Sequence, residues 1–183
     1  MLKAFKNKVV TISNKEDIEG LEHKIRFSAT KTSRVLSELL SQHDDLFVFN
    51  RLRFEAVGYD PLDDNRPINF IEQLNQSFTY LVSLRAVDYL LSKHPEAIPY
   101  TLNLGTSSGF DIISCDGTIV AEAFAATTPE SNRKLNKDIQ KVKNSKAVHK
   151  YVFYYSPVRN DGSYVIQDVC IVSLKELGVK SSQ

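Results

Sequence analysis

The sequence predicts an α/β protein in which helices flank a central mixed β-sheet. Three observations lead to this fold class. Apolar residues recur at helical spacing after Pro67, short strand-like runs follow from Tyr100, and helical spacing returns after Pro129 before a further strand. The expected core therefore has the order helix, three strands, helix, strand.

Length and composition indicate a single domain spanning residues 1–183. The chain is 42% hydrophobic and 25% charged, which is ordinary for a globular domain with a sizeable core. No internal repeat or interdomain linker interrupts it. We expect residues 67–157 to form the core and residues 1–66 to form an N-terminal extension of helix and strand.

Charge and apolar patterning restrict the function classes. The formal net charge of +1 argues against a uniformly basic protein that binds nucleic acid through its whole surface. No uncharged apolar run approaches the length of a membrane span, so we expect no membrane partner and a cytoplasmic location. Cys115 and Cys170 are expected to be buried and reduced.

The N-terminal extension shows weaker patterns than the core. Lys8–Ile12 favours a short edge strand, and Ser33–Gln42 has apolar residues at helical spacing. Leu46–Gly58 fits either a strand or a helix and is left undecided. Asp60–Pro67 is a chain-breaking segment, because proline fixes its own torsion angle and Asp and Asn side chains satisfy turn amides.

A long helix is expected directly after Pro67, ending near His94-Pro95. Its apolar stripe recurs at steps of three and four residues. The stripe consists of Ile71, Leu74, Phe78, Leu81, Val82, Ala86, Tyr89 and Leu90.

Strand-like segments follow the long helix. We expect strands at Tyr100–Leu104, Phe110–Cys115 and Thr118–Ala126, with a hairpin turn at Asp116-Gly117, because glycine adopts positive φ without strain. After a break at Pro129–Asn132, we expect a helix with Leu135, Ile139 and Val142 on one face. The remaining expected elements are strands at Tyr151–Tyr155 and Tyr164–Val172 and a closing helical turn at Leu174–Leu177.

Two acidic triplets stand on adjoining expected strands. Gly109-Phe110-Asp111 precedes the hairpin and Glu122-Ala123-Phe124 follows it. Glu122 lies in Ile119–Ala126, the most apolar run of the chain, where an unpartnered carboxylate would cost several kcal/mol. A metal ion, or a cation from the next helix, would remove that cost.

This order of elements around two carboxylates resembles the PD-(D/E)XK family, the restriction endonuclease-like nucleases. The resemblance covers roughly Pro67 to Pro157. It implies a restriction endonuclease-like αβββαβ core and a nuclease that cleaves DNA phosphodiester bonds with Mg²⁺ or Mn²⁺. It implies that Asp111 and Glu122 are metal ligands, that the Ala123 carbonyl can join them, and that Glu72 is a third acid.

Phe124 departs from this family, which carries a lysine at that position. Phenylalanine cannot orient water or offset charge, so an active enzyme needs a cation from elsewhere. Lys134 on the following helix is our preferred substitute and Lys137 the second. The alternative is that the lysine was lost, that Phe124 packs in the core, and that the protein binds nucleic acid or a protein partner without catalysis.

Each acid also has an ordinary structural explanation. Asp111 could cap the turn at Gly109, Glu122 could pair with a lysine, and the dipole of the long helix alone favours Glu72 in its first turn.

Basic residues concentrate between Ser131 and Lys150, where seven cations and one acid give a local charge of +6. Such a helix suits phosphate contacts, although a solvated lysine face is an equal alternative. DNA is the expected partner, with RNA and a homodimer left open. The expected nucleic-acid contacts are Arg133, Lys134, Lys137 and Lys141.

Overall fold

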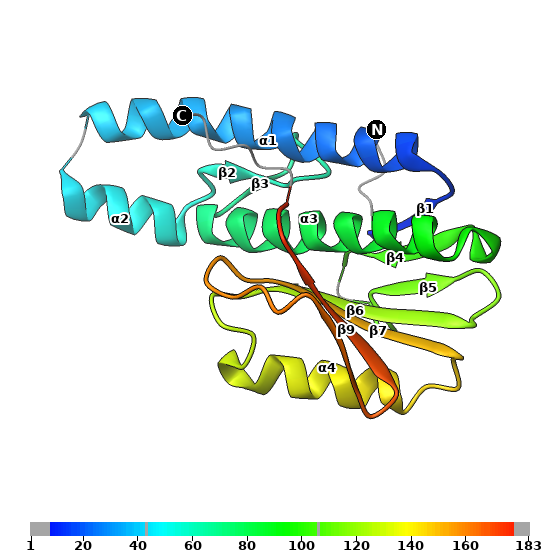
Figure 1. Ribbon diagram of the computed structural model, residues 1–183. Helices are drawn as coiled ribbons and strands as arrows, with labels where there is room; N and C mark the ends of the chain where they lie inside the picture. The colour runs from blue at the N-terminus through cyan, green and yellow to red at the C-terminus, as the bar shows by residue number, and fades with distance from the viewer. Residues whose placement is uncertain (1–7, 43, 106, 178–183) are drawn as a thin grey trace. The chain divides into compact units, whose positions relative to one another are not determined.

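A computed structural model describes residues 8–42, 44–105 and 107–177, which form two compact units (Figure 1). Of the described residues, 16–42 and 44–78 belong to the first unit, and 8–15, 79–105 and 107–177 belong to the second. The long helix α3 (Phe70–Lys93) begins in the first unit and ends in the second. The protein is a mixed α/β structure, as the sequence predicts. In the described ranges, no helix is long and apolar enough to span a bilayer.

The first unit is mainly helical. Its elements are α1 (Lys15–Gln42), α2 (Asp45–Phe54), the strands β2 (Gly58–Tyr59) and β3 (Pro67–Ile68), and the start of α3. Helix α1 begins well before the expected Ser33. The undecided segment 46–58 is largely helical, because the Asp44 side chain accepts hydrogen bonds from the backbone N–H groups of Leu46 and Phe47 and so caps α2.

A buried glutamine holds the first unit together. The Gln73 side chain on α3 accepts hydrogen bonds from the Thr32 hydroxyl on α1 (2.6 Å) and from the Tyr59 N–H on β2 (3.1 Å), and it donates to Ser28 (3.0 Å). A Cβ at Gly58 would lie 2.5 Å from the Gln73 side-chain oxygen, so a larger residue there would displace this amide from its hydrogen bonds. The expected chain break at 60–67 is confirmed, and Arg66 bonds the buried Asp60 within it.

The second unit contains a seven-stranded mixed sheet in the order β1-β4-β5-β6-β7-β9-β8. Strands β1, β4, β5 and β6 are antiparallel neighbours, β7 is parallel to β6 and to β9, and β8 is antiparallel to β9. The strands are β1 (Val9–Ile12), β4 (Tyr100–Asn103), β5 (Ile112–Ser114), β6 (Ile119–Ala125), β7 (His149–Tyr155), β8 (Ser163–Ile166) and β9 (Val169–Leu174).

Helices cover both faces of this sheet. Helix α4 (Lys134–Lys143) buries Leu135, Ile139 and Val142 against one face, where they join Val120 and Phe124 of β6 in a single core cluster. Tyr89 of α3 packs on the opposite face, edge-on to Tyr151 and Phe153 of β7. The order α3, β4, β5, β6, α4, β7 is the predicted order helix, three strands, helix, strand.

The C-terminal segment departs from the prediction in two places. Tyr164–Val172 is not one strand, because Gln167 and Asp168 take left-handed conformations and turn the chain between β8 and β9. The expected helical turn at Leu174–Leu177 is also wrong, since β9 continues through Leu174 and no helix follows in the described residues up to 177. The expected burial of both cysteines is wrong too, because Cys115 is exposed and Cys170 half-buried.

The β8–β9 turn gives a stability prediction. Gln167 has φ 50°, a region in which side chains are strained and glycine is not. We expect Gln167→Gly to raise the free energy of unfolding by about 0.5–1 kcal/mol, measured by urea denaturation. A matched change at an extended position of the same strand, Val165→Gly, should lower it. An unchanged or reduced stability of Gln167→Gly would contradict the assigned turn.

Candidate acidic site on the sheet

Asp111 and Glu122 lie opposite each other on neighbouring strands of the second unit. The register pairs Ile112 with Ala121, so the next positions outward are Asp111 and Glu122. The Asp111 N–H donates to Glu122 Oε1 (3.3 Å), and the Ala123 N–H donates to Asp111 Oδ2 (2.9 Å). The Asp111 side chain therefore accepts a backbone N–H of β6 directly before β5 begins, and the two carboxylates share one location.

A lysine from helix α4 neutralises Glu122. Lys141 Nζ lies 2.6 Å from Glu122 Oε1, and the Glu122 side chain is 3% exposed against 42% for Lys141. The lysine also lies over the Phe110 ring. A buried carboxylate needs a charged partner, and for Glu122 that partner is a lysine of the next helix, one of the two possibilities that the sequence suggests.

A second lysine–acid pair, Lys134 and Asp138, stands earlier on α4 than Lys141. Lys134 Nζ lies 2.8 Å from Oδ1 of the buried Asp138, four residues later, and also lies over the Phe124 ring at 5.7 Å from its centroid. Phe124 itself is buried and stacks on Tyr154. Phe124 thus packs in the core with an ammonium group above it, at the position where the PD-(D/E)XK pattern has lysine.

Asp138 is a site residue that sequence reasoning missed. It is buried, and its Oδ2 atom has no hydrogen-bond partner. The available signal was that Asp138 is the single acid of a basic stretch and stands three residues after Leu135, at the spacing of the apolar face of the helix. An acid on the buried side of an amphipathic helix needs a partner, and Lys134 is at the i−4 position.

Burial dominates the electrostatics of the three acids. Burial and, to a smaller extent, the nearby Asp111 charge raise the pKa of Glu122 to about 7, against the lowering effect of Lys141. Burial also raises the pKa of Asp111, against the opposing Ala123 N–H, and the pKa of Asp138, against Lys134. With all three acids ionised, two ammonium groups leave one negative charge uncompensated, which favours a proton or a bound cation.

The remaining predicted site residues are Arg133, Lys137 and Glu72. Arg133 and Lys137 are exposed at the beginning of α4, and Arg133 has a left-handed φ of 57°. Glu72 belongs to the first unit, where its carboxylate accepts a hydrogen bond from Gln76 (2.8 Å) and lies 3.9 Å from Arg66. Its role as a third acid stays a prediction.

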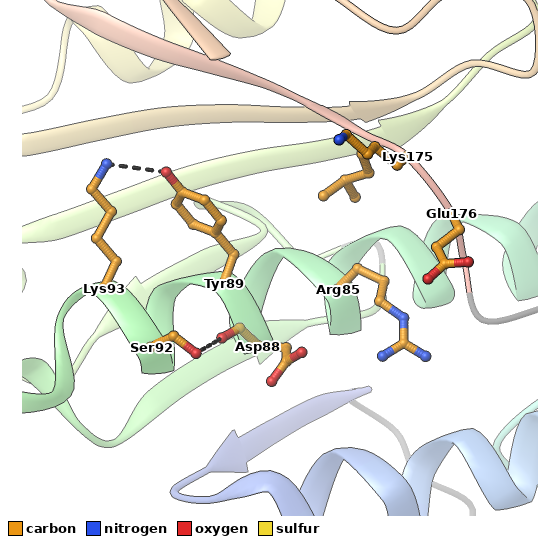
Figure 2. A pocket seen from close by; sticks show the side chains of 8 residues that line it. Arg85, Asp88, Tyr89, Ser92, Lys93, Lys175 and Glu176 are labelled. Atoms are coloured by element: carbon orange, nitrogen blue, oxygen red, sulfur yellow. Dashed lines mark hydrogen bonds between the residues drawn. The ribbon is translucent and has the colours of Figure 1, made fainter. Parts of the chain in front are cut away.

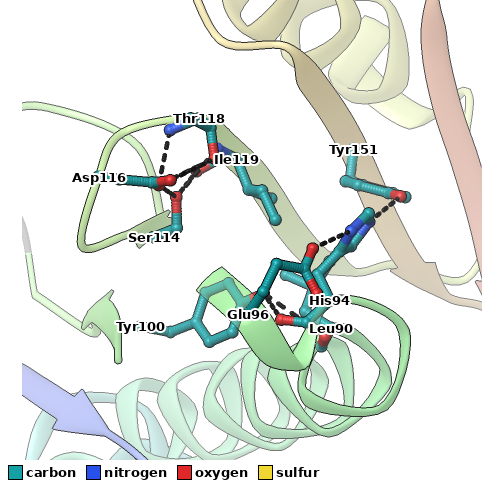
Figure 3. A network of polar contacts seen from close by, with 9 residues as sticks. All are labelled: Leu90, His94, Glu96, Tyr100, Ser114, Asp116, Thr118, Ile119 and Tyr151. Carbon is teal, nitrogen blue, oxygen red and sulfur yellow. Dashed lines mark hydrogen bonds and ion pairs between the residues drawn. The ribbon is translucent and has the colours of Figure 1, made fainter. Parts of the chain in front are cut away.

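Two histidines of the second unit lie close together, with the rings of His94 and His149 4.6 Å apart. His94 bonds the buried Tyr151 hydroxyl through Nε2 (2.8 Å), and Glu96 lies 3.4 Å from its Nδ1 (Figure 3). Tyr100 donates to the His94 carbonyl (3.1 Å), close to the end of α3. These hydrogen bonds join the end of α3 to β4 and β7, so we assign the histidine cluster a structural role.

A cavity of about 430 Å³ lies between the second half of α3 and the residues after β9. Its lining mixes both charges, with Arg85, Lys93 and Lys175 beside Asp88 and Glu176 (Figure 2). Lys93 donates to the Tyr89 hydroxyl (3.0 Å). Asp88 belongs to α3 and Glu176 follows β9, and the cavity shares no lining residue with the acidic site.

The donor set at Asp111 and Glu122 suits a small, hard cation. No group of three or more His, Cys, Asp or Glu placed to hold a metal ion occurs among residues 8–42, 44–105 and 107–177. Mg²⁺ commonly uses only one or two protein carboxylates and completes its coordination with water and substrate phosphate. Two adjacent carboxylates are therefore compatible with Mg²⁺ and a poor match to zinc, which prefers Cys and His.

Comparison with protein-family models, with curated proteins and with solved structures gives no match for this chain.

Proposed function

We propose that this protein is a magnesium-dependent nuclease that cleaves DNA phosphodiester bonds and has a restriction endonuclease-like core. One observation carries the proposal. The buried carboxylate of Glu122 on β6 and the half-buried carboxylate of Asp111, directly before β5, meet at one location, with the Lys141 ammonium 2.6 Å from Glu122. Acid, acid and cation are the three groups that the resemblance requires of such a site.

The strand arrangement supports the proposed core. From α3 to β7 the elements follow the order that the resemblance implies, and the carboxylates fall on β6 and directly before β5. Within the second unit, α4 lies on the face of the sheet that carries Glu122, since Lys141 of that helix pairs with it.

In this proposal each group has a separate role. Asp111 and Glu122 would hold the divalent cation, which supplies Lewis-acid stabilisation of charge developing on the scissile phosphate. Lys141 holds the Glu122 carboxylate in place before the cation binds and offers its ammonium to a phosphate oxygen afterwards. Lys134, fixed by Asp138 above Phe124, supplies the charge that the missing motif lysine would carry.

A cleavage assay tests the proposal. Purified full-length protein is incubated with supercoiled plasmid and with end-labelled single- and double-stranded oligonucleotides, in Mg²⁺, Mn²⁺ or EDTA. We expect metal-dependent nicking or shortening that EDTA abolishes. Intact DNA of every form, with a protein shown to be folded and to bind Mn²⁺, would contradict a DNA nuclease, and cleavage of RNA alone would change the substrate.

A second candidate is a nuclease-fold protein that binds nucleic acid without cutting it. The observation that favours it is the pair of departures at the site, namely Phe124 packed in the core and Glu122 already neutralised by Lys141. Affinity would then come from exposed cations of α4, which need no metal.

Nucleic-acid binding through α4 gives its own prediction. Replacing the exposed Arg133 and Lys137 by glutamine should weaken DNA binding by about tenfold at low salt and reduce the slope of log affinity against log salt by about 2. Fluorescence anisotropy in EDTA measures both. The matched control removes two exposed cations of α1, with Lys24→Gln and Arg34→Gln. Equal losses in the two double variants would show that α4 is not the contact surface.

A further inference from the structure

Asp138 on α4 carries a buried oxygen atom that its ion pair leaves without a hydrogen bond. The side chain is 4% exposed, and its Oδ1 atom receives the Lys134 ammonium at 2.8 Å. The Oδ2 atom is buried and has no hydrogen-bond partner. Buried polar atoms in folded proteins are nearly always satisfied, so this oxygen requires a further donor or a cation.

The ion pair with Lys134 does not account for the burial of Asp138. Pairs four residues apart on a helix are weak, and they are weaker when the basic residue comes first, as Lys134 does here. The lysine side chain is 44% exposed, so solvent screens its charge. Removing a carboxylate from water costs more than such a pair contributes. The burial of Asp138 therefore implies a second partner.

The spacing of residues along α4 places Asp138 over strand β6. Lys134, Asp138 and Lys141 stand at i, i+4 and i+7 and so share one face of the helix. Lys134 lies over the Phe124 ring. Lys141 pairs with Glu122, two residues earlier on the strand. Asp138 stands between the two lysines on the buried side of α4, so its carboxylate enters the space between the helix and the sheet.

The charge of Asp138 is coupled to the acidic site. Burial is the main cause that raises the pKa of Asp138, and the Asp111 charge raises it further, against Lys134. The Asp138 charge in turn adds to burial and to Asp111 in raising the pKa of Glu122. Acids that repel one another in this way attract the same cation.

We propose that Asp138 is the third acid of the cation site, in the role that the sequence predicts for Glu72, and that it acts from outside the ligand shell. The inference rests on the proposed function, because Asp111 and Glu122 would hold the cation itself. No group of three His, Cys, Asp or Glu placed around one ion occurs in the described parts of the chain, which favours an outer position for Asp138. There its Oδ2 atom accepts a hydrogen bond from the hydration shell of Mg²⁺ or Mn²⁺.

Calorimetric titration of the metal-stripped full chain with Mn²⁺ at pH 8 tests this role. Asp138→Asn keeps the size of the side chain and removes its charge, and we expect it to weaken Mn²⁺ binding by about tenfold at unchanged stoichiometry. Asp138→Ala should show a similar loss. The matched control is Asp168→Asn, which removes the acid of another lysine–aspartate pair of the same unit, Lys150 with Asp168 at 2.7 Å, and should leave the affinity unchanged.

A double variant separates an effect on the cation from an effect through Lys134. Lys134→Gln removes the ion pair and leaves the Asp138 carboxylate in place. We expect Asp138→Asn to weaken Mn²⁺ binding by about tenfold in the Lys134→Gln background as well. A loss that vanishes in this background would overturn the inference, because Asp138 would then only hold Lys134.

The outcomes distinguish this inference from the metal site itself. Asp138→Asn removes a buried charge, so we expect it to fold, and circular dichroism checks every variant. Wild-type affinity in folded Asp138→Asn and Asp138→Ala would overturn a role for Asp138 and leave the site at Asp111 and Glu122 in place. Absence of Mn²⁺ binding to the wild type would overturn that site and this inference together.

Discussion

Replacing Glu122 with glutamine is expected to reduce DNA cleavage by at least about 1,000-fold while leaving the protein folded. The substitution keeps the size of the side chain and an oxygen that can accept from Lys141 Nζ and from the Asp111 N–H. It removes the negative charge that a divalent cation requires of its ligand. Loss of the cation removes the largest source of charge stabilisation at the phosphate.

The control for this variant is Glu130→Gln. Glu130 is an exposed acid of the same unit that pairs with Arg159, away from the metal-ligand pair. Its cleavage rate should match that of the wild type. Asp111→Asn should reproduce the loss at Glu122. Wild-type rates in both Glu122→Gln and Asp111→Asn, with Mg²⁺ still required, would place the reaction elsewhere.

Stability of the metal-free protein is expected to fall as pH rises from 5 to 8. The pKa of Glu122 in the folded chain is raised to about 7, chiefly by burial, above its ordinary value of 4.5. Between these two pKa values the folded state binds more protons than the unfolded state. The stabilisation from protonated Glu122 is therefore complete below the unfolded pKa and is lost as the pH rises through the folded pKa. A pKa difference of this size corresponds to roughly 3 kcal/mol in the free energy of unfolding.

Urea denaturation in EDTA at several pH values measures this dependence, and Glu122→Gln isolates it. The variant has no proton to lose at that position, so its stability should change less over the same range, and the difference between the two proteins should reach roughly 3 kcal/mol at pH 8. Parallel pH profiles for the two proteins would contradict the burial of an ionisable Glu122. Added Mg²⁺ should flatten the wild-type profile, because it favours the carboxylate.

The element order was predictable because local patterns determine it. Proline at 67 and 95 and the change of apolar period at Tyr100 define α3 and the strands that follow. The hairpin at Asp116-Gly117 needed only a glycine with positive φ, which Gly117 has. By contrast, the turn at Gln167-Asp168 contains no glycine or proline, so the sequence pattern does not predict the break between β8 and β9.

The pairing of Asp111 with Glu122 could be predicted because a short hairpin fixes the register of the strands beside it. Lys141 and Asp138 could not be assigned, since their contacts depend on the rotation of α4 over the sheet. The sequence predicts Lys141 only as a nucleic-acid contact, whereas in the structure its ammonium group pairs with Glu122. A role for Glu72 depends on a contact between elements far apart in the sequence, which periodicity does not determine.

The most direct test of the acidic site is calorimetric titration of the metal-stripped protein with Mn²⁺ at pH 8, where Glu122 is largely ionised. Wild type, Glu122→Gln and Glu130→Gln are titrated side by side. We expect one saturable site in wild type and in Glu130→Gln, and none in Glu122→Gln. Identical titrations of wild type and Glu122→Gln, whether both bind or neither does, would contradict a divalent-cation site at Asp111 and Glu122.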